Sequence, residues 1–174
     1  IQGRPSPTVG PFFSGQLRVS SSCIYQEGST NTVQLNTTTD YAIRVALYLA
    51  TVRRAAGSAE ICSSMGIPPG ILGSVSRRLR KHGIVDTLRG TNGGYLLARQ
   101  PEDISLRDII VAMEGTTRIN RCLEPDGYCS RNGVPVCPVH RFYSRIQTKL
   151  DEAFQEMTVA ALLADDLDEK LEAI

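Results

Sequence analysis

The amino-acid sequence predicts a mainly α-helical fold with one small β hairpin. Apolar residues recur at spacings of three and four along several segments, which is the period of an amphipathic helix. Glycines and prolines divide these segments into lengths typical of single helices. One glycine-rich stretch, residues 90–94, lies between two short segments suited to β-strands. We therefore expect helices on both sides of a hairpin.

The charge of the chain is balanced overall but unevenly distributed. With 19 basic and 18 acidic residues, the composition argues against a polybasic binder. Residues 70–99, however, hold six basic residues and one acid, whereas residues 151–174 hold eight acids and one lysine. The first segment can meet a polyanion, while the second, with its acidic tail at 165–174, cannot.

Composition also limits the setting of the protein. No apolar run approaches the ~20 residues that a bilayer requires, so we expect a soluble protein without a membrane partner. Five cysteines cannot all pair internally and no secretory signal is recognisable, which favours the reducing cytoplasm. Residues 1–32 are rich in Ser, Gly, Pro and Thr without a persistent period, so we expect a disordered head or an untranslated extension.

The first helix is expected to begin after Leu35. One of the threonines at 37–39 can cap it, and Asp40 places an acid in the first turn, where the helix dipole favours negative charge. Apolar residues then recur with helical spacing until about Arg53, before Gly57.

Two shorter helices follow and are joined by a glycine-containing turn. Ser58 can cap the first, which runs through Met65, and the prolines at 68–69 start the second, which stops at Gly83. The second helix turns apolar residues inward and carries a polar and basic face formed by Ser74, Ser76, Arg77, Arg78, Arg80 and Lys81. A short helix, a turn and a basic helix form the pattern of a helix-turn-helix.

A hairpin is expected directly after the basic helix. Residues 84–89 and 95–98 suit two strands, and residues 90–94 suit a turn with positive backbone angles. A basic helical face or a glycine hairpin alone is ordinary. In immediate succession they predict a winged helix-turn-helix over residues 33–115 that binds nucleic acid.

Two more helices are expected beyond the hairpin. Ser105 and Asp108 form a capping box for a helix that ends at Gly115. A long helix follows at about 139–157, and its apolar stripe serves either as a dimer seam or as a face buried on its own domain. We therefore expect a dimerisation region at residues 139–164.

Three cysteines and one histidine cluster around a loop expected at residues 116–138. Cys122, Cys129, Cys137 and His140 lie within nineteen residues, in a stretch rich in Gly, Pro and Asn. Such a loop has little apolar surface to order itself, and metal ligation can supply that free energy. Thiolates suit iron–sulfur clusters, zinc or copper(I), but gaps of six and seven residues fit zinc less well. Free thiols in a flexible loop are the alternative.

The remaining cysteines and the second histidine have no companions at ligand spacing. Cys62 lies on the inner side of its helix, where a small buried hydrophobe is the default. Cys23 falls in the head, and His82 lies at a helix C-terminus, where an imidazolium suits the dipole. None of the three is assigned a metal role.

Five motifs in order resemble the Rrf-two (Rrf2) family of bacterial winged-helix regulators. They are QLNTTTDYAIRVALYLA, the IP-x-x-x-L-x-x-x-x-x-x-LRK-x-G pattern of the basic helix, LRG-x-x-GGYLLA in the wing, I-x-L-x-D-I-x-x-A-x-EG from Ile104, and the three-cysteine loop. The resemblance covers about residues 34–164. Since family members usually begin just before the position of Leu35, Val33 is a candidate start read from a non-AUG codon.

The resemblance implies a homodimer with a long crossed helix, which binds a two-fold operator in double-stranded DNA, and an iron–sulfur cluster that tunes DNA affinity. Carried over by position, Cys122, Cys129 and Cys137 are implied thiolate ligands. The fourth ligand stays open, since His140 resembles an imidazole ligand and Asp40 resembles a carboxylate contributed across the dimer. Three thiolates with an imidazole favour [2Fe-2S] slightly over [4Fe-4S].

The resemblance also implies DNA contacts. Arg89 resembles a wing arginine that enters the minor groove, where narrow A·T tracts concentrate negative potential. The basic helix offers candidate phosphate contacts, namely Arg77, Arg78, Arg80 and Lys81, and Ser74 as a candidate base reader. Gly70 and Gly73 stand where some relatives have polar base-reading side chains, which leaves the operator open. Asn92 replaces a commoner wing glycine, although asparagine tolerates positive φ.

Together these features predict a transcription factor that senses iron–sulfur status, redox state or nitric oxide through its cluster. The alternative is a winged-helix regulator that senses through free thiols or zinc, and the third is a cluster carrier that does not bind DNA. No Ser-His-Asp order, paired carboxylate signature or phosphate-binding glycine loop indicates an enzyme.

Overall fold

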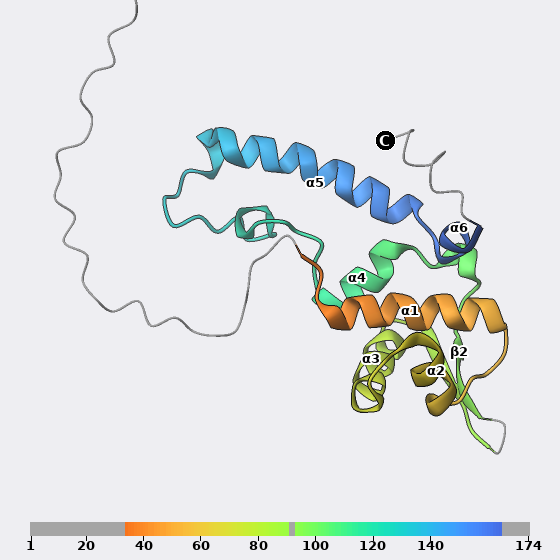
Figure 1. The fold of residues 1–174 in the computed structure, drawn as a ribbon. Coiled ribbons are helices and arrows are strands. Elements are labelled where there is room, and N and C mark those ends of the chain that lie inside the picture. Colours follow the sequence, from red (N-terminus) through yellow and green to blue (C-terminus); the bar gives the residue numbers. More distant parts are fainter. Residues whose placement is uncertain (1–33, 91–92, 165–174) are drawn as a thin grey trace, which may run out of the picture. The chain divides into compact units, whose positions relative to one another are not determined.

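The computed structural model describes residues 34–90 and 93–164 (Figure 1). The expectations for residues 1–32 with Cys23, and for Val33, Asn92 and the tail at 165–174, lie outside these ranges. Within the described ranges, no helix has the length and apolar character needed to span a bilayer.

Six α-helices and one two-stranded antiparallel sheet make up the described part of the chain. The helices are α1 (Thr37–Val52), α2 (Ser58–Met65), α3 (Pro69–Lys81), α4 (Leu106–Glu114), α5 (Pro138–Glu156) and α6 (Val159–Ala164). The strands are β1 (Val85–Leu88) and β2 (Gly94–Leu97), and the 3₁₀ turns are η1 (Pro101–Asp103), η2 (Arg121–Leu123) and η3 (Val134–Val136). The mainly α-helical fold with one small hairpin is confirmed.

Helix α1 lies at the centre of the core and contacts α2, α3, α4, α6 and β2. Its inward positions include Ala42, Val45 and Ala46, which are fully buried and small enough for close packing of neighbouring helices. In Figure 1, α2 and α3 lie on one side of α1, and α4 and α6 lie on the other. Helix α3 is thus anchored by one face and presents its other face to solvent.

The starts of the helices differ from the sequence expectations in how they are capped. Asn36, rather than a threonine at 37–39, is the N-cap of α1, and its side chain makes no cap bond. Ser58 is the first helical residue of α2 rather than its cap. The capping box of α4 is confirmed, because Asp108 N donates to Ser105 Oγ over 3.1 Å and Ser105 N donates to the Asp108 carboxylate over 3.2 Å.

The wing is attached to the helical core at the start of β2, close to the turn. Strands β1 and β2 pair antiparallel, with Leu88 opposite Gly94 beside the turn. A Cβ at Gly94 would lie 2.3 Å from the carbonyl oxygen of Ala56, so this position has no room for a side chain. Ala56 and Tyr95 exchange two backbone hydrogen bonds of 2.9 Å. The glycine therefore allows the wing to pair with the α1–α2 connection.

The chain after the long helix returns to the core. The helix expected at 139–157 is observed as α5, and α6 follows as a separate helix that the sequence pattern does not distinguish. Leu106 N donates to Met157 O over 2.7 Å, and Val159 N donates to Ile104 O over 2.9 Å. These bonds hold the α5–α6 junction against the start of α4.

Candidate nucleic-acid interface and metal centre

Helix α3 turns a polar and basic face to solvent. Leu72, Val75 and Leu79 anchor its inner face in the core. The exposed positions of α3 include Gly70, Gly73, Ser74, Arg77, Arg78, Arg80 and Lys81. Ser76, expected on this polar face from its place in the sequence, is buried instead, at 3% exposed. The outer face of α3 therefore carries positive charges of the kind that bind nucleic-acid phosphates.

The individual residues of this surface differ in their local bonds. Ser74 Oγ donates to the carbonyl oxygen of Ile71 over 2.8 Å. Arg80 Nη1 lies 3.4 Å from Thr87 Oγ1 and links α3 to the wing. Arg89 is exposed directly after β1. The basic helix and the turn end of β1 thus form one surface.

Arg78 has an additional role within the fold. Its Nη1 donates to the carbonyl oxygen of Met113 over 2.6 Å. Met113 lies in the last turn of α4, where unpaired carbonyl groups and the helix dipole favour a cation. Arg78 therefore ties α3 to the end of α4, and its contact with phosphate stays a prediction.

Gly70 and Gly73 lie on the exposed face without a structural need for glycine. A Cβ added at either position would meet no heavy atom within 4 Å, and neither residue has a left-handed backbone conformation. Each glycine nevertheless lowers helix stability by about 1 kcal/mol relative to alanine. Neither packing nor backbone geometry in the described structure explains this choice.

Polar contacts order part of the cysteine loop, which has little apolar surface. Arg121 forms an ion pair with Asp126 through Nη1 and Nη2, and its Cζ lies 5.5 Å from the centre of the Tyr128 ring. The hydrogen bond from Arg121 holds the pKa of the Asp126 carboxyl below its ordinary value, although burial opposes this. Cys122 N donates to the side chain of Asn120 over 3.3 Å. These contacts shape the segment between the first two loop cysteines.

His140 lies between two of the loop cysteines. Its Nδ1 is 3.4 Å from Cys122 Sγ, and its backbone N–H donates to Cys137 Sγ over 3.4 Å. Cys137 is the N-cap of α5, so its sulfur occupies the place of a capping oxygen. The loop cysteines Cys122 and Cys137 therefore both contact the first turn of α5.

Cys129 lies in a different environment. Backbone N–H groups of Gly133 and Arg131 hold the pKa of its thiol below the ordinary value, although desolvation opposes this. The described cysteines Cys62, Cys122, Cys129 and Cys137 form no disulfide with one another. Cys62 is buried in α2, as expected.

The donor set fits an iron–sulfur cluster in its chemistry, because thiolates and imidazole are the ligands such clusters take. Over the described ranges, however, no three His, Cys, Asp or Glu side chains are close enough to hold a metal ion. Cys122 and His140 line a hollow of about 440 Å³ together with Gln147 of α5. Asp40, the alternative ligand, forms an ion pair of 2.5 Å with Arg44 on its own helix.

A polar cluster that the sequence pattern does not indicate connects the loop to α5. Gln147 is 2% exposed, and its Oε1 accepts from Ile119 N over 2.9 Å. Its Nε2 donates to Thr117 O over 3.1 Å and to Asp151 Oδ1 over 3.0 Å. A glutamine in a helix with an apolar stripe gives no sequence signal of such burial.

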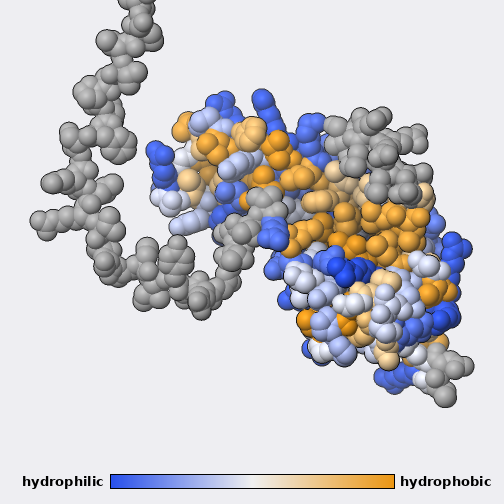
Figure 2. Space-filling model, viewed as in Figure 1, coloured by the Kyte–Doolittle hydropathy of each residue, from blue (hydrophilic) through white to orange (hydrophobic). Residues whose placement is uncertain are grey.

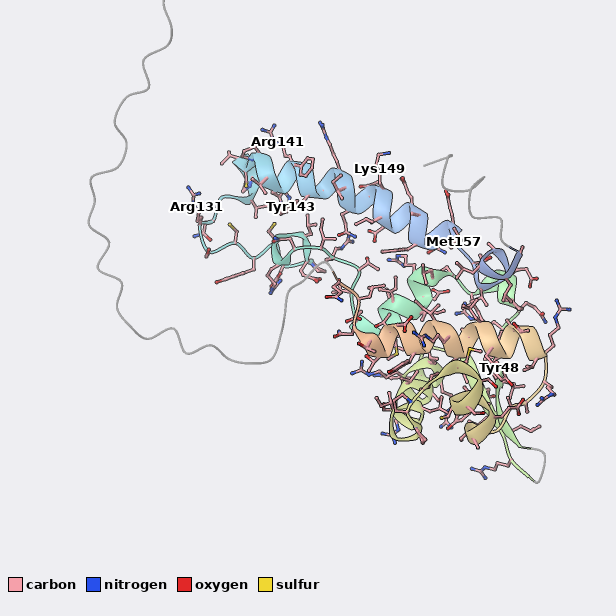
Figure 3. The ribbon with its side chains drawn as sticks, viewed as in Figure 1. Tyr48, Arg131, Arg141, Tyr143, Lys149 and Met157 are labelled. Carbon is pink, nitrogen blue, oxygen red and sulfur yellow. The ribbon has the colours of Figure 1, made fainter. Side chains whose placement is uncertain are left out.

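In Figure 3, α5 turns Tyr143 toward the loop and Arg141 away from it.

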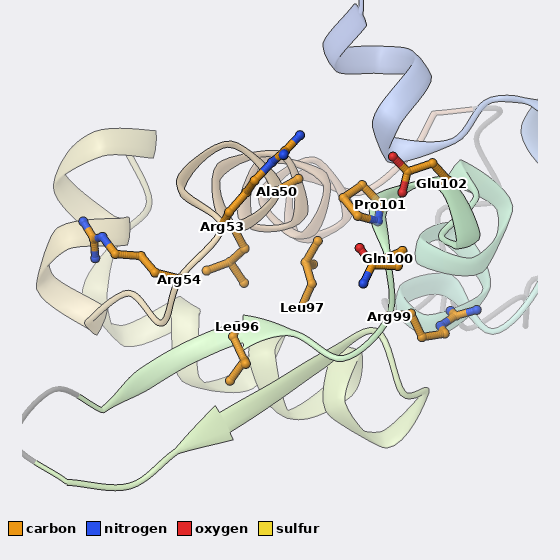
Figure 4. A pocket seen from close by; sticks show the side chains of 10 residues that line it. Ala50, Arg53, Arg54, Leu96, Leu97, Arg99, Gln100, Pro101 and Glu102 are labelled. Carbon is orange, nitrogen blue, oxygen red and sulfur yellow. The ribbon is translucent and has the colours of Figure 1, made fainter.

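A second hollow of about 280 Å³ lies between α1, β2 and η1 (Figure 4). Leu49, Ala50 and Leu97 give it apolar walls. Two of its arginines are engaged elsewhere: Arg54 pairs with Glu60 at 2.6 Å, and Arg99 donates to carbonyl oxygens and to a carboxylate. This hollow belongs to the junction of the wing with the core.

The fold and its basic surface define a class of protein. An exposed basic helix followed by a hairpin on a helical core is the architecture of a winged-helix DNA-binding protein. The family model of Rrf2, described as an iron-dependent transcriptional regulator, matches residues 35–165. The chain belongs to the Rrf2 family of transcriptional regulators.

Individual relatives agree with this assignment. The HTH-type transcriptional regulator IscR of Sodalis glossinidius is 32% identical over 108 residues, which are 62% of this chain and 64% of the relative. NsrR of Halalkalibacterium halodurans is 28% identical over 137 residues, which are 77% of this chain and 92% of the relative. These relatives are transcriptional regulators and not enzymes.

Solved structures share the fold. The structure of CymR, described as the global cysteine regulator of B. subtilis, has a TM-score of 0.64 at 24% identity and covers 76% of this chain and 98% of CymR. The T. potens IscR structure has a TM-score of 0.60 at 24% identity and covers 78% of this chain and 90% of that structure. The winged-helix fold predicted from the sequence is confirmed.

Proposed function

We propose that the chain regulates transcription through an iron–sulfur cluster that sets its operator affinity. The proposed ligands are Cys122, Cys129, Cys137 and His140. The observation that carries this proposal is the 3.4 Å contact between His140 Nδ1 and Cys122 Sγ, which joins two ligand-type atoms from different elements. The similarity to IscR and NsrR supports it. When bound, the cluster supplies iron chemistry that responds to iron supply, oxidants or nitric oxide.

The chain's own residues connect such a group to the long helix. Cys137 accepts the backbone hydrogen bond of His140 at the start of α5, so any change at this sulfur acts on the first turn of the helix. His140 as fourth ligand favours [2Fe-2S] slightly over [4Fe-4S]. Asp40 of a second copy is the alternative, and its half-exposed pair with Arg44 is weak enough to be exchanged.

DNA binding is assigned to residues 33–115, the winged helix-turn-helix. In this proposal α3 enters the major groove of a two-fold operator, and Arg89 reaches the minor groove. Residues 116–138 bind the cluster and residues 139–164 form the dimer seam. Phe142 and Val139, at 59% and 52% exposed, leave an apolar face on α5 that a second copy can cover. In Figure 2, apolar side chains also gather where α5 approaches α4 and α6.

The test is to purify the protein without oxygen and measure its visible absorption, iron and sulfide. We expect a coloured protein, with two irons per chain for [2Fe-2S] or four for [4Fe-4S]. Alanine at Cys122, Cys129 or Cys137 should abolish the colour, whereas Cys62→Ala, which changes a buried core thiol, should keep it. A colourless wild-type protein that still binds DNA would reject the cluster and retain the winged helix.

A second candidate is a sensor that uses thiols or zinc on the same winged helix. The lowered pKa of the Cys129 thiol favours it, because the thiolate is the reactive form of cysteine. This candidate predicts a colourless protein whose DNA affinity changes after oxidation by peroxide or after zinc removal. The third candidate, a cluster carrier, predicts a coloured protein without affinity for DNA.

A further inference from the structure

The first residues of the cysteine loop are held by α5 through a closed set of hydrogen bonds. Gln147 uses its amide oxygen for Ile119 N and its amide nitrogen for Thr117 O and Asp151 Oδ1. Asp151 accepts two further bonds, from Thr117 Oγ1 over 2.6 Å and from Arg118 Nη1 over 2.9 Å. All these bonds fix residues 117–119 to one face of α5. We call this set the Gln147–Asp151 latch.

The residues directly before the latched ones, at the end of α4, are bonded to other helices of the winged helix. Arg78 of α3 binds Met113 O over 2.6 Å. Glu114 accepts bonds from Asn36 N over 3.0 Å and from Thr39 Oγ1 at the start of α1. Gly115, with φ of 82°, ends α4 directly before the latched residues. Residues 113–119 are therefore bonded to α3, α1 and α5 within a few peptide units.

We propose that the Gln147–Asp151 latch and Arg78 are positioning elements that transmit the state of the cysteine loop to α3. The inference rests on the proposed function and names its route of regulation. His140 lies two helical turns before Gln147 on α5, and Cys122 lies three residues after Ile119 on the loop. A shift of α5 against the loop strains the latch, and the strained segment displaces Met113 O from Arg78.

The latch is suited to this role because its hydrogen bonds depend on the orientation of the Gln147 amide. A buried amide keeps all its bonds in one orientation only, and an unsatisfied buried polar group is costly. Small movements of α5 therefore have two outcomes: the latch stays closed and residues 113–119 follow, or it opens. An apolar contact at the same place tolerates sliding.

The first test measures affinity of the full chain for a duplex selected from random-sequence DNA by the wild-type protein. Affinity is measured with and without the cluster. In wild type we expect a ratio of roughly 5- to 150-fold, and in Gln147→Leu a fall of this ratio to below about 2-fold. Gln155→Leu, which changes an exposed glutamine of the same helix, should keep the wild-type ratio. An unchanged ratio in Gln147→Leu would overturn the inference.

Two further variants separate transmission from simple loss of folding. Gln147→Glu keeps the acceptor for Ile119 N but places a second carboxylate beside that of Asp151. It should reduce the ratio of the DNA affinities with and without the cluster, while cluster content stays at the wild-type level. Arg78→Met should reduce the ratio too. The double variant Gln147→Leu/Arg78→Met should lose no more than either single variant, because both lie on one route. Additive effects would overturn the inference.

Amide hydrogen exchange of the cluster-free protein tests the latch without DNA or cluster. Gln147→Leu should accelerate exchange at residues 113–119 and in the last turn of α3, whereas Gln155→Leu should not. Acceleration confined to α5 would overturn the inference. Equal DNA affinity of the wild-type protein with and without the cluster would instead reject the proposed function. The hydrogen-exchange experiment would still test the latch in that case.

Discussion

Glu114, the last residue of α4, accepts hydrogen bonds from both the backbone and the side-chain nitrogen of Asn36, over 3.0 and 2.7 Å. Thr39 donates a third bond to the same carboxylate. The N-terminus of α1 has no cap from its own N-cap side chain. A carboxylate from another helix supplies the acceptor and the negative charge that this end requires.

Replacing Glu114 should destabilise the fold at the start of α1. We expect Glu114→Ala to lower the free energy of unfolding by about 1 kcal/mol, the usual cost of losing an N-cap acceptor. Chemical denaturation of both proteins at pH 7 measures this difference. An equal stability of the two proteins would show that water caps α1 as well as Glu114 does.

The contribution of Glu114 should depend on pH. Burial opposes its charge, but the bonds from Thr39 and Asn36 prevail and hold the pKa of Glu114 below its ordinary value. The stabilisation is therefore present above the unfolded pKa of about 4.3 and is lost as the pH falls through the lower folded pKa. The difference between wild type and Glu114→Ala should shrink below that pH. A constant difference from pH 7 to the acid transition would contradict the assignment.

Glu60 should make a second acid-sensitive contribution, at the α1–α2 contact. The hydrogen bond from Arg54, and then that from Tyr48 at 2.8 Å, lower the pKa of Glu60 to about 2. Because the folded pKa lies below the unfolded value, the stabilisation is complete above about pH 5 and is lost between there and about pH 2. As the pH falls through this window, the free energy of unfolding of wild type should approach that of Glu60→Gln. An exposed control, Glu152→Gln, should show no such convergence with wild type.

Local patterns in the sequence predict the helices and hairpin well. The period of apolar residues predicts α1, the Ser, Gly and Pro residues that flank α2 and α3 predict their limits closely, and the Ser105–Asp108 pair predicts the start of α4. These features depend on neighbours within one or two helical turns. The contact of His140 with Cys137 is equally local, because these two residues are three positions apart in the chain.

Contacts between distant segments could not be predicted in this way. Glu114 and Asn36 are 78 residues apart, and Gln147 and Ile119 are 28 apart. A polar residue on a helix looks solvent-exposed unless its distant partner is known, as with Gln147. Arg78 resembles its basic neighbours in sequence, and only the fold shows that it binds the end of α4.

Gly73 offers a test that separates folding from recognition. A Cβ at this exposed helical position meets nothing within 4 Å, so Gly73→Ala should raise the free energy of unfolding by about 1 kcal/mol. If the outer face of α3 lies against DNA, the same change should weaken binding to the selected duplex. Thermal unfolding and DNA titration of one preparation measure both. A stabilised protein with unchanged affinity would place Gly73 outside the DNA contact.

Arg77 should act as a phosphate contact. It is exposed on α3, and neutralisation of one phosphate releases counterions irrespective of sequence. Arg77→Ala should weaken binding to specific and non-specific duplexes alike, and should reduce the slope of log affinity against log salt by about 1. An unchanged salt slope in Arg77→Ala would remove this residue from the interface.

Arg89→Ala should instead weaken binding to A·T-rich duplexes most, because a narrow minor groove attracts arginine.

Phe142 tests whether the exposed face of α5 is a dimer seam. Its side chain is 59% exposed, and Ile146, one turn further along α5, is 36% exposed. A charge on this face costs nothing in a monomer but must be buried in a dimer, so Phe142→Glu should weaken self-association by at least about tenfold. Analytical ultracentrifugation across concentrations measures this shift, with Gln155→Glu as a control on the same helix. If Phe142→Glu associates like wild type, the dimer uses another surface, and the apolar stripe of α5 has a different partner.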